Sequence, residues 1–591
     1  MSNCLRIMVR AMTYKFRELQ KAKKLQVEGP ENKLAVLGNC STQFFSDAIE
    51  GFGKLSGINM SVYDADYNQI DEQLLDENSE VYSFKPNEIL IWLCSEKLYE
   101  DFLSLGMEDR VIFAENTIKK IEQYWNLIEK NCESRIIQLN FAEINDAVMG
   151  QYSCKVESTF IYQIRKLNYL LQESALRNNR VYIVDLLSMQ IQLGAENVFN
   201  APIYYSAKMP IAQSALSNLA SAVIDIIKAM SGKIKKCVVL DLDNTLWGGV
   251  IGDDGINGIE IGELGRGHVF TNLQKWLKQL KEYGIILAVC SKNEEVLAKE
   301  PFTSHEDMVL RLDDISIFVA NWDDKASNIR AIQESLNIGM DSMIFLDDNP
   351  FERNLVRESL AGLEVPELPD DPSNWLEFLE KQNYFETASY TGPSMDRTKL
   401  YQEEFKRRKL EQSFSSIDDY LESLKMLGYY HSFEPAKYSR IAQLTQRSNQ
   451  FNLRTIRYTE DEIQHLAESD AHITLYFTLK DKFGDYGLVS VVILKKLSVD
   501  ELFIDAWLMS CRVLKRGMEE FVMNSIIMTA KSEGFDSISA EYIPTAKNMM
   551  VKDIYSKMGY EQISDNKYTI SVDKYSEKKT YISKEEVENE S

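Results

Sequence analysis

The sequence predicts a multidomain α/β protein, and three observations carry that prediction. The chain has 591 residues, which is more than one hydrophobic core accommodates. Two successive blocks alternate short apolar strands with amphipathic helices, a pattern typical of parallel sheets covered by helices. A third block groups several strands before one long helix, which favours an α+β domain.

The first block covers residues 33–230 and predicts a three-layer α/β domain. Its strands are expected at "LAVLG", "EILIWL", "RIIQLNF" and "RVYIVDLL". Residues 1–32 precede it and include the basic stretch "MSNCLRIMVRAMTYKFRELQKAKK", which lacks the uninterrupted apolar core of a signal peptide. We expect this segment to be a solvated helical arm.

The second block, residues 234–385, has the strongest strands: "CVVLDLD", "IILAVCSKN" and "SMIFLDDN". Continuous apolar runs of this kind are typical of parallel strands buried on both faces. Between the first two strands, apolar residues recur at helical spacing, which predicts a β-α-β unit. These residues are Val269, Phe270, Leu273, Trp276, Leu277 and Leu280.

The third block, residues 422–573, follows a helical linker predicted over residues 386–421. Strands are expected at "ITLYFTL", "GLVSVVIL" and "ELFIDAWL", before a long helix after Gly517. The remaining residues, 574–591, are rich in charge, and we expect them to be a disordered tail.

Composition excludes several classes of function. The net charge of −24 argues against broad binding to nucleic acid. Eight cysteines without a CxxC pair, together with only five histidines, argue against a zinc site or a disulfide framework. The sequence holds no apolar run of about 18 residues, so we expect no membrane-spanning helix. The chain is predicted to be cytoplasmic.

Polar residues follow each strand of the second block, where ligands bind in open α/β sheets. Two of them, in "DLD", point the same way because strand side chains repeat every two residues. Carboxylates with a lysine suit Mg²⁺ and a phosphate group, since Mg²⁺ prefers oxygen ligands and lysine neutralises phosphoryl charge. The predicted site residues are Asp241, Asp243, Ser291, Lys325, Asp347 and Asp348.

The order D-x-D-N-T, Ser, Lys and D-D resembles the four motifs of haloacid dehalogenase-superfamily phosphotransferases. The resemblance implies a Rossmann-like parallel sheet in which Asp241 is the nucleophile and Asp243 the general acid/base. It implies that Ser291 and Lys325 hold the phosphoryl oxygens. Asp347 or Asp348 would complete the Mg²⁺ shell that Asp241 and Asp243 begin.

Flanking motifs resemble the FkbH-like branch of that superfamily, and the resemblance covers most of residues 33–572. They are "DLDNTLWGGVIGDDG", "CSKN", "NWDDKASNI", "FLDDNPFER", "LTQRSNQFNLRTIRYTE" and "MSCRVLKRGMEEF". The resemblance implies transfer of a glyceryl unit from 1,3-bisphosphoglycerate to an acyl carrier protein, a separate chain. Only about 50 residues separate the first two motifs, which leaves no room for a large cap domain.

Glyceryl transfer from an acyl phosphate needs a thiol. Cys290 is the first candidate because it precedes Ser291 at the phosphate site, where Lys292 would favour the thiolate. Cys511 in "MSCRVLKRG" is the second candidate.

The outer blocks show two further resemblances. "VLGNCSTQ" is reminiscent of the G-D-S block of SGNH hydrolases, with Asn39 and Cys40 in place of Asp and Ser, and no histidine precedes His268. The third block resembles GNAT acyltransferases, which implies phosphopantetheine or CoA binding near Arg512 and Gly517.

Three functions stay open. The leading hypothesis is the glyceryl transferase/phosphatase, with "KRRK", residues 406–409, as a docking site for the acidic carrier. The first alternative is a plain Mg²⁺-dependent phosphatase acting on a small phosphorylated metabolite. The second is a non-catalytic assembly protein, which the intact D-x-D and D-D pairs disfavour.

Overall fold

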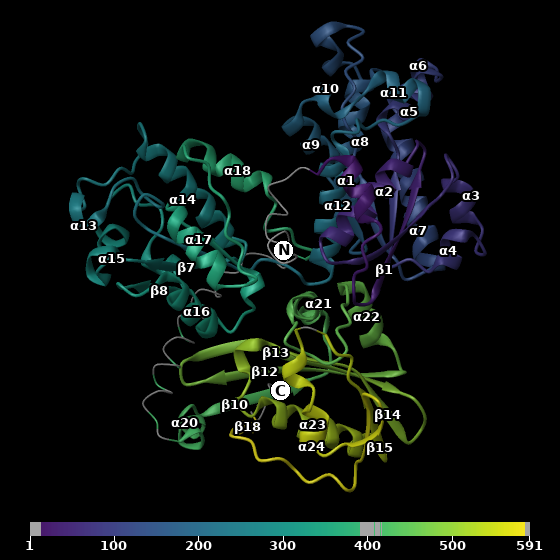
Figure 1. Cartoon of the computed structure of the whole chain (residues 1–591). Helices are drawn as coiled ribbons and strands as arrows, with labels where there is room; N and C mark the ends of the chain where they lie inside the picture. The colour runs from purple at the N-terminus through teal and green to yellow at the C-terminus, as the bar shows by residue number, and fades with distance from the viewer. Residues whose placement is uncertain are drawn as a thin grey trace, which may run out of the picture. The chain divides into compact units, whose positions relative to one another are not determined.

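A computed structural model describes residues 14–389, 403, 407, 410, 414, 416–545 and 547–584. The chain divides into two compact units, residues 1–228 and residues 229–591 (Figure 1). The prediction of a multidomain α/β protein with parallel sheets is confirmed. No helix of the described ranges is both long and apolar enough to cross a membrane.

A parallel sheet of five strands, in the order β2-β1-β3-β4-β5, forms the centre of the first unit. The strands are β1 (Glu31–Gly38), β2 (Asn59–Asp64), β3 (Glu88–Trp92), β4 (Arg135–Leu139) and β5 (Val181–Val184). The segments expected from the sequence supply β1, β3, β4 and β5. The resemblance to SGNH hydrolases stays a prediction.

Helices cover both faces of this sheet. On one face, helices α3, α5, α7 and α8 bury a core with Leu37, Ile91 and Ile136. Towards the other face α2 lies against β2 and α12, because Met60 and Ile224 both approach Gly53. The helices are α1 (Phe16–Ala22), α2 (Gln43–Leu55), α3 (Ile70–Leu75), α4 (Glu80–Phe84), α5 (Ser95–Leu103), α6 (Met107–Val111), α7 (Phe113–Asn131), α8 (Phe160–Leu176), α9 (Leu186–Leu193), α10 (Ala195–Val198), α11 (Ala201–Ala207) and α12 (Leu216–Met230), with a 3-10 turn at Gly150–Lys155.

Helix α1 corrects the expectation of a solvated N-terminal arm. Its apolar residues Phe16, Leu19 and Ala22 are buried. A side chain at Gly51 of α2 would collide with the backbone of Leu19, so glycine at this position permits close packing of the two helices. Residues 1–13 of the arm lie outside the described ranges.

The second unit contains a parallel sheet of four strands in the order β8-β7-β6-β9. Its strands are β6 (Cys237–Leu240), β7 (Ile286–Ser291), β8 (Ile317–Ala320) and β9 (Met343–Leu346). The helices around it are α13 (Ile251–Asp254), α14 (Gly267–Glu282), α15 (Glu295–Ser304), α16 (Lys325–Leu336), α17 (Pro350–Ser359) and α18 (Trp375–Lys381), with 3-10 turns at Leu312–Asp314, Met340–Ser342 and Pro372–Asn374.

Between β6 and β7 the chain forms only the one-turn α13 and the predicted helix α14. Phe270, Leu273 and Leu277 of α14 are buried against the sheet, as the helical spacing predicts. All of residues 241–285 are described, and they contain no separate cap domain. The carboxyl ends of the four strands are therefore not covered by an insertion of this segment.

The second unit also holds a mixed sheet of nine strands, in the order β16-β17-β15-β14-β13-β12-β10-β18, with β11 paired to β14. Helices α23 and α24 pack on one face, and α21 and α22 pack on the other. The strands are β10 (Met426–His431), β11 (Phe451–Asn452), β12 (His472–Asp481), β13 (Gly484–Lys496), β14 (Glu501–Met509), β15 (Ser537–Glu541), β16 (Glu561–Ser564), β17 (Lys567–Ser571) and β18 (Ile582–Lys584). The helices are α20 (Ile417–Ser423), α21 (Tyr438–Arg447), α22 (Glu460–Glu468), α23 (Met518–Glu533) and α24 (Ile554–Met558), with 3-10 turns at Pro435–Lys437, Cys511–Val513 and Met549–Val551.

Two expectations about charged segments need correction. The predicted tail is ordered as far as Lys584, because Ile582 is buried in the core of the mixed sheet and β18 pairs with β10. Arg407, expected on a carrier-docking surface, is fully buried and donates to both carboxylate oxygens of Asp481 at 2.8 and 2.9 Å. Lys406, Arg408 and Lys409 lie outside the described residues.

Candidate active site

Four ionisable residues meet at the carboxyl ends of β6 and β9. Asp241 directly follows β6, and Asp347 and Asp348 directly follow β9. Lys325 is the first residue of α16, whose N-cap, Asp324, accepts from the backbone N–H of Ser327 at 2.8 Å. This cap fixes the start of α16 at Lys325, so the side chain of Lys325 reaches the ends of the strands.

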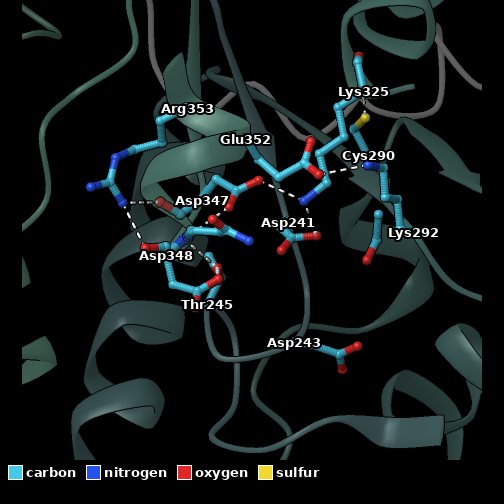
Figure 2. A network of polar contacts seen from close by, with 12 residues as sticks. Asp241, Asp243, Thr245, Cys290, Lys292, Lys325, Asp347, Asp348, Glu352 and Arg353 are labelled. Atoms are coloured by element: carbon cyan, nitrogen blue, oxygen red, sulfur yellow. Dashed lines mark hydrogen bonds and ion pairs between the residues drawn. The ribbon is translucent and has the colours of Figure 1, made fainter. Parts of the chain in front are cut away.

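Lys325 bridges two carboxylates, as Figure 2 shows. Its Nζ lies 3.0 Å from Oδ1 of Asp241 and 2.6 Å from Oδ2 of Asp347. Burial lowers the pKa of Lys325, but the two carboxylates outweigh that effect and hold the pKa above its usual value. The ammonium group is therefore charged and fixes the orientation of Asp241.

Negative charge exceeds positive charge in this cluster. Burial raises the pKa of Asp241 to about 7, against the opposing attraction of Lys325. Burial and the neighbouring charge of Asp347 also raise the pKa of Asp348. One oxygen from each of Asp241, Asp347 and Asp348 lies within 4.8 Å of the others. An oxygen-only donor set with uncompensated negative charge fits a hard divalent cation.

The carboxylate of Asp243 does not belong to this group. It accepts hydrogen bonds from Trp247 Nε1 at 3.0 Å, from the backbone N–H of Ile251 at 2.9 Å and from Asn293 Nδ2 at 2.8 Å. Figure 2 shows Asp243 apart from the other three carboxylates. The expectation that its side chain binds the metal is therefore not supported, whereas a role in proton transfer stays a proposal.

These contacts explain the tryptophan and the glycines of "DNTLWGG". Trp247 is fully buried and orients Asp243 through its indole N–H. Asn244 and Gly249 both have positive φ, and the backbone N–H of Gly249 donates to Oδ1 of Asn244 at 3.0 Å. The resulting turn reverses the chain directly after Asp243, so that Trp247 can donate to the Asp243 carboxylate.

Ser291 lies beside this cluster at the end of β7. Its Oγ accepts from Nδ2 of Asn293 at 3.2 Å, so one amide links Ser291 to Asp243. Both side chains are buried.

Three residues position the site without having been assigned a role from the sequence. Thr245 Oγ1 accepts from the backbone N–H of Asp348 at 3.1 Å. Arg353 donates to the backbone oxygens of Asp347 and Asp348 at 2.9 and 2.7 Å. Asn293, the third, lies in the quoted "CSKN". Thr245 and Arg353 also lie in quoted motifs; the contact of Thr245 spans 103 positions of the chain, whereas Arg353 reaches back to backbone oxygens five and six residues before it.

The structure argues against Cys290 as the thiol relay. Its side chain is fully buried on the face of the sheet opposite to Ser291, and its Sγ lies 3.8 Å from the backbone oxygen of Lys325. Burial raises the pKa of this thiol to about 12, so the thiolate is scarce near neutral pH. Lys292, expected to favour the thiolate, forms an ion pair with Glu352 at 2.6 Å instead.

Cys511 is not brought to this site either. It lies in the turn after β14, where Nδ2 of Asn337 donates to its backbone oxygen. Cys511 shares a cavity with Lys236, which precedes β6, whereas Asp241 follows β6. A strand of four residues is about 13 Å long at about 3.3 Å per residue, so the two groups lie at opposite edges of the sheet.

The phosphopantetheine or CoA site expected near Arg512 and Gly517, at the start of α23, is partly filled by groups of the protein itself. Gly517 precedes the helix with positive φ, and its backbone oxygen accepts from Thr580 Oγ1 at 2.8 Å. The carboxylate of Glu519 accepts from the backbone N–H of Lys515 at 3.3 Å, a place that an anionic ligand would need. Arg512 faces a cavity elsewhere, so it and Gly517 do not form one site.

The family model described as FkbH, N-terminal domain, matches residues 33–228. A crystal structure of the N-terminal part of the protein BF1531 from Bacteroides fragilis, containing a phosphatase domain complexed with Mg, is 45% identical to this chain. It covers 64% of this chain and 100% of its own length, with a TM-score of 0.61. Among curated proteins, none matches the chain.

Two acetyltransferase structures are similar to about a quarter of the chain. Spermidine N-acetyltransferase from Vibrio cholerae is 13% identical over 26% of this chain and 98% of its own, with a TM-score of 0.21. The ribosomal-protein-S18-alanine N-acetyltransferase from Escherichia coli is 12% identical over 25% and 94%, with a TM-score of 0.20.

The BF1531 relative matches over its full length at high identity, and the FkbH model matches the first unit. Asp241, Lys325, Asp347 and Asp348 form the cluster expected of a phosphatase domain. The chain therefore belongs to the FkbH-like family and has a phosphatase-type function.

Proposed function

We propose that this chain is an Mg²⁺-dependent phosphatase and glyceryl transferase, which loads a glyceryl unit from 1,3-bisphosphoglycerate onto an acyl carrier protein. The observation that carries the phosphatase part is the cluster of Asp241, Asp347 and Asp348 around Lys325. Mg²⁺ is the cofactor: its ligands would be drawn from these three carboxylates, and it supplies positive charge that stabilises the phosphoryl group in transfer.

In the phosphatase step, the Asp241 carboxylate attacks the phosphorus of a phosphate monoester. The P–O bond to the substrate breaks, and the leaving alkoxide takes a proton from Asp243. Water then hydrolyses the aspartyl phosphate, with Asp243 as base, and restores both groups. Lys325 and Ser291 hold the phosphoryl oxygens. The hydrogen bonds to Trp247 and Asn293 fix Asp243 for this role.

In the glyceryl step, the thiol of the carrier attacks the carbonyl carbon of the acyl phosphate. Its sulfur forms the thioester bond, the C–O bond to the acyl phosphate breaks, and inorganic phosphate leaves with the electron pair and takes up the thiol proton. The remaining phosphate monoester is then the substrate of Asp241. The burial of Cys290 and the distant position of Cys511 favour direct transfer to the carrier over an enzyme thiol relay.

Exposed apolar residues at the same edge favour a tethered substrate over a free metabolite. Trp322 follows β8, Phe351 lies in the first turn of α17 after β9, and Val296 lies in the first turn of α15 after β7. All three side chains are at least two-thirds exposed. Large exposed apolar side chains are often found where another protein docks. We propose that the carrier docks there.

The test incubates the full chain with 1,3-bisphosphoglycerate, Mg²⁺ and a carrier protein that bears its phosphopantetheine arm, and measures phosphate release and intact carrier mass. Wild type should add a glyceryl unit without phosphate. Asp241→Asn should add a glyceryl unit that retains one phosphate, because the thiol step does not need Asp241. A carrier lacking the arm is the control. Phosphate release without any carrier adduct would leave the plain phosphatase as the function.

A further inference from the structure

A cavity of about 350 Å³ lies in the second unit, at the edge of the four-stranded sheet opposite to the active site. Three of its lining residues mark the start of a strand: Lys236 precedes β6, Ile286 begins β7 and Ser342 precedes β9. Ligands of the phosphatase reaction bind at the other edge. This cavity is therefore a separate site.

The mixed sheet and its helix α21 form the other wall of this cavity. Lys236 Nζ donates to the backbone oxygen of Arg447 at 2.9 Å, and Lys547 forms an ion pair with Asp341 at 2.5 Å. Nδ2 of Asn337 donates to the backbone oxygen of Cys511. These contacts fix the positions of the cationic side chains before any ligand binds.

The lining is strongly basic in a chain whose net charge is −24. Among the described residues that line the cavity, Asp341 is the only carboxylate, and it is paired with Lys547. Burial lowers the pKa of Lys236 to about 8, and the nearby arginines act in the same direction. The other cations of the lining are Arg440, Arg447 and Arg512.

We propose that this cavity binds the diphosphate group of a small molecule. Besides Lys547, one lysine and three arginines line the cavity, a positive charge that suits a diphosphate better than a single phosphate. Guanidinium groups match phosphate oxygens in geometry, and a cavity between low-dielectric walls strengthens the attraction. The proposal is independent of the proposed function, because none of these residues belongs to the active site.

Inorganic pyrophosphate is the probe, titrated calorimetrically into the full chain with chelator present so that no metal fills the active site. Arg512→Gln should weaken binding about tenfold or more, because it removes a charge-assisted hydrogen bond to phosphate. Lys236→Met is the second variant. Arg177→Gln, on an exposed arginine of the first unit, is the matched control and should bind as wild type does.

A local readout separates this site from the active site. The Cys511 thiol lines the cavity, so pyrophosphate at ten times its dissociation constant should slow alkylation of Cys511 by iodoacetamide about tenfold. Exposed Cys154 is the internal control, measured by peptide mapping of the same sample. Undetectable binding would overturn the proposal, and so would binding that does not protect Cys511 more than Cys154 and is unchanged in Arg512→Gln and Lys236→Met.

Discussion

The two parallel sheets of this chain differ at the carboxyl end of the strand that comes first in the sequence, β1 in one and β6 in the other. In the first unit β1 is followed by Asn39 and Cys40, and Oδ1 of Asn39 accepts from the backbone N–H of Cys94 at 2.7 Å. In the second unit β6 is followed by Asp241, which shares Lys325 with Asp347. The end of the first strand thus carries a hydrogen-bonded neutral amide in one sheet and uncompensated charge in the other.

At the carboxyl ends of β1 and β2, the polar side chains are engaged with one another. Oδ1 of Asp64 accepts from the hydroxyls of Thr42 and Ser46, both at 2.7 Å. Burial, together with Cys94, raises the pKa of the Cys40 thiol well above its usual value. No histidine precedes His268 to act as a base. An active site therefore follows from ionisable groups and not from the sheet that carries them.

Asp241→Asn should change phosphate release more than any other substitution in this comparison of the two sheets. An amide cannot form the phosphoryl intermediate, so phosphate release from a phosphate monoester, which depends on Asp241 alone, should fall on the order of 10⁴-fold or more. Asn39→Ala, the matched change at the end of β1, should leave phosphate release unchanged. Circular dichroism checks that both variants fold. Near wild-type turnover in Asp241→Asn would remove the assignment of the nucleophile.

Removal of Mg²⁺ should have the next largest effect. Exhaustive chelation should lower phosphate release by about 100-fold or more, because the charge at Asp241, Asp347 and Asp348 then stays uncompensated. Added Mg²⁺ should restore it. Zn²⁺ should restore less, since the cluster offers no histidine or cysteine ligand. Activity that survives chelation would contradict the metal site.

A raised carboxyl pKa alone does not mark an active site, and Glu88 of the first sheet tests this. Burial raises its pKa from 4.5 to about 7, against the opposing charge of Arg135. The folded state then holds a proton that the unfolded state loses, so this contribution to stability is present below about pH 4.5 and lost as the pH rises through about 7.

Glu88→Gln should therefore stabilise the protein by roughly 3 kcal/mol at pH 8 and by little near pH 4.5. Thermal unfolding at the two pH values measures the difference, and phosphate release should not change. The same stability gain at both pH values would show that the effect is packing and not titration.

Much of this could be predicted from the sequence, because strand ends and the D-x-D, Lys and D-D motifs are local features. The direction of the Cys290 side chain could not be predicted. Residues next to each other on a strand point to opposite faces, and only the fold decides which face holds the site. The cavity around Lys236 and Arg512 was also beyond prediction, because its residues are about 275 positions apart and meet only through packing.

Cys290→Ala should have the smallest effect of these changes. Its thiol packs among apolar residues of the second sheet, and Cys40 of the first sheet is also buried. Carrier loading should stay within about threefold of wild type, because the carrier supplies the thiol, while the small cavity should lower stability by about 1 kcal/mol. Carrier mass and thermal unfolding measure both quantities, and Cys40→Ala is the matched control. Loss of loading in Cys290→Ala with phosphate release retained would restore Cys290 as the relay.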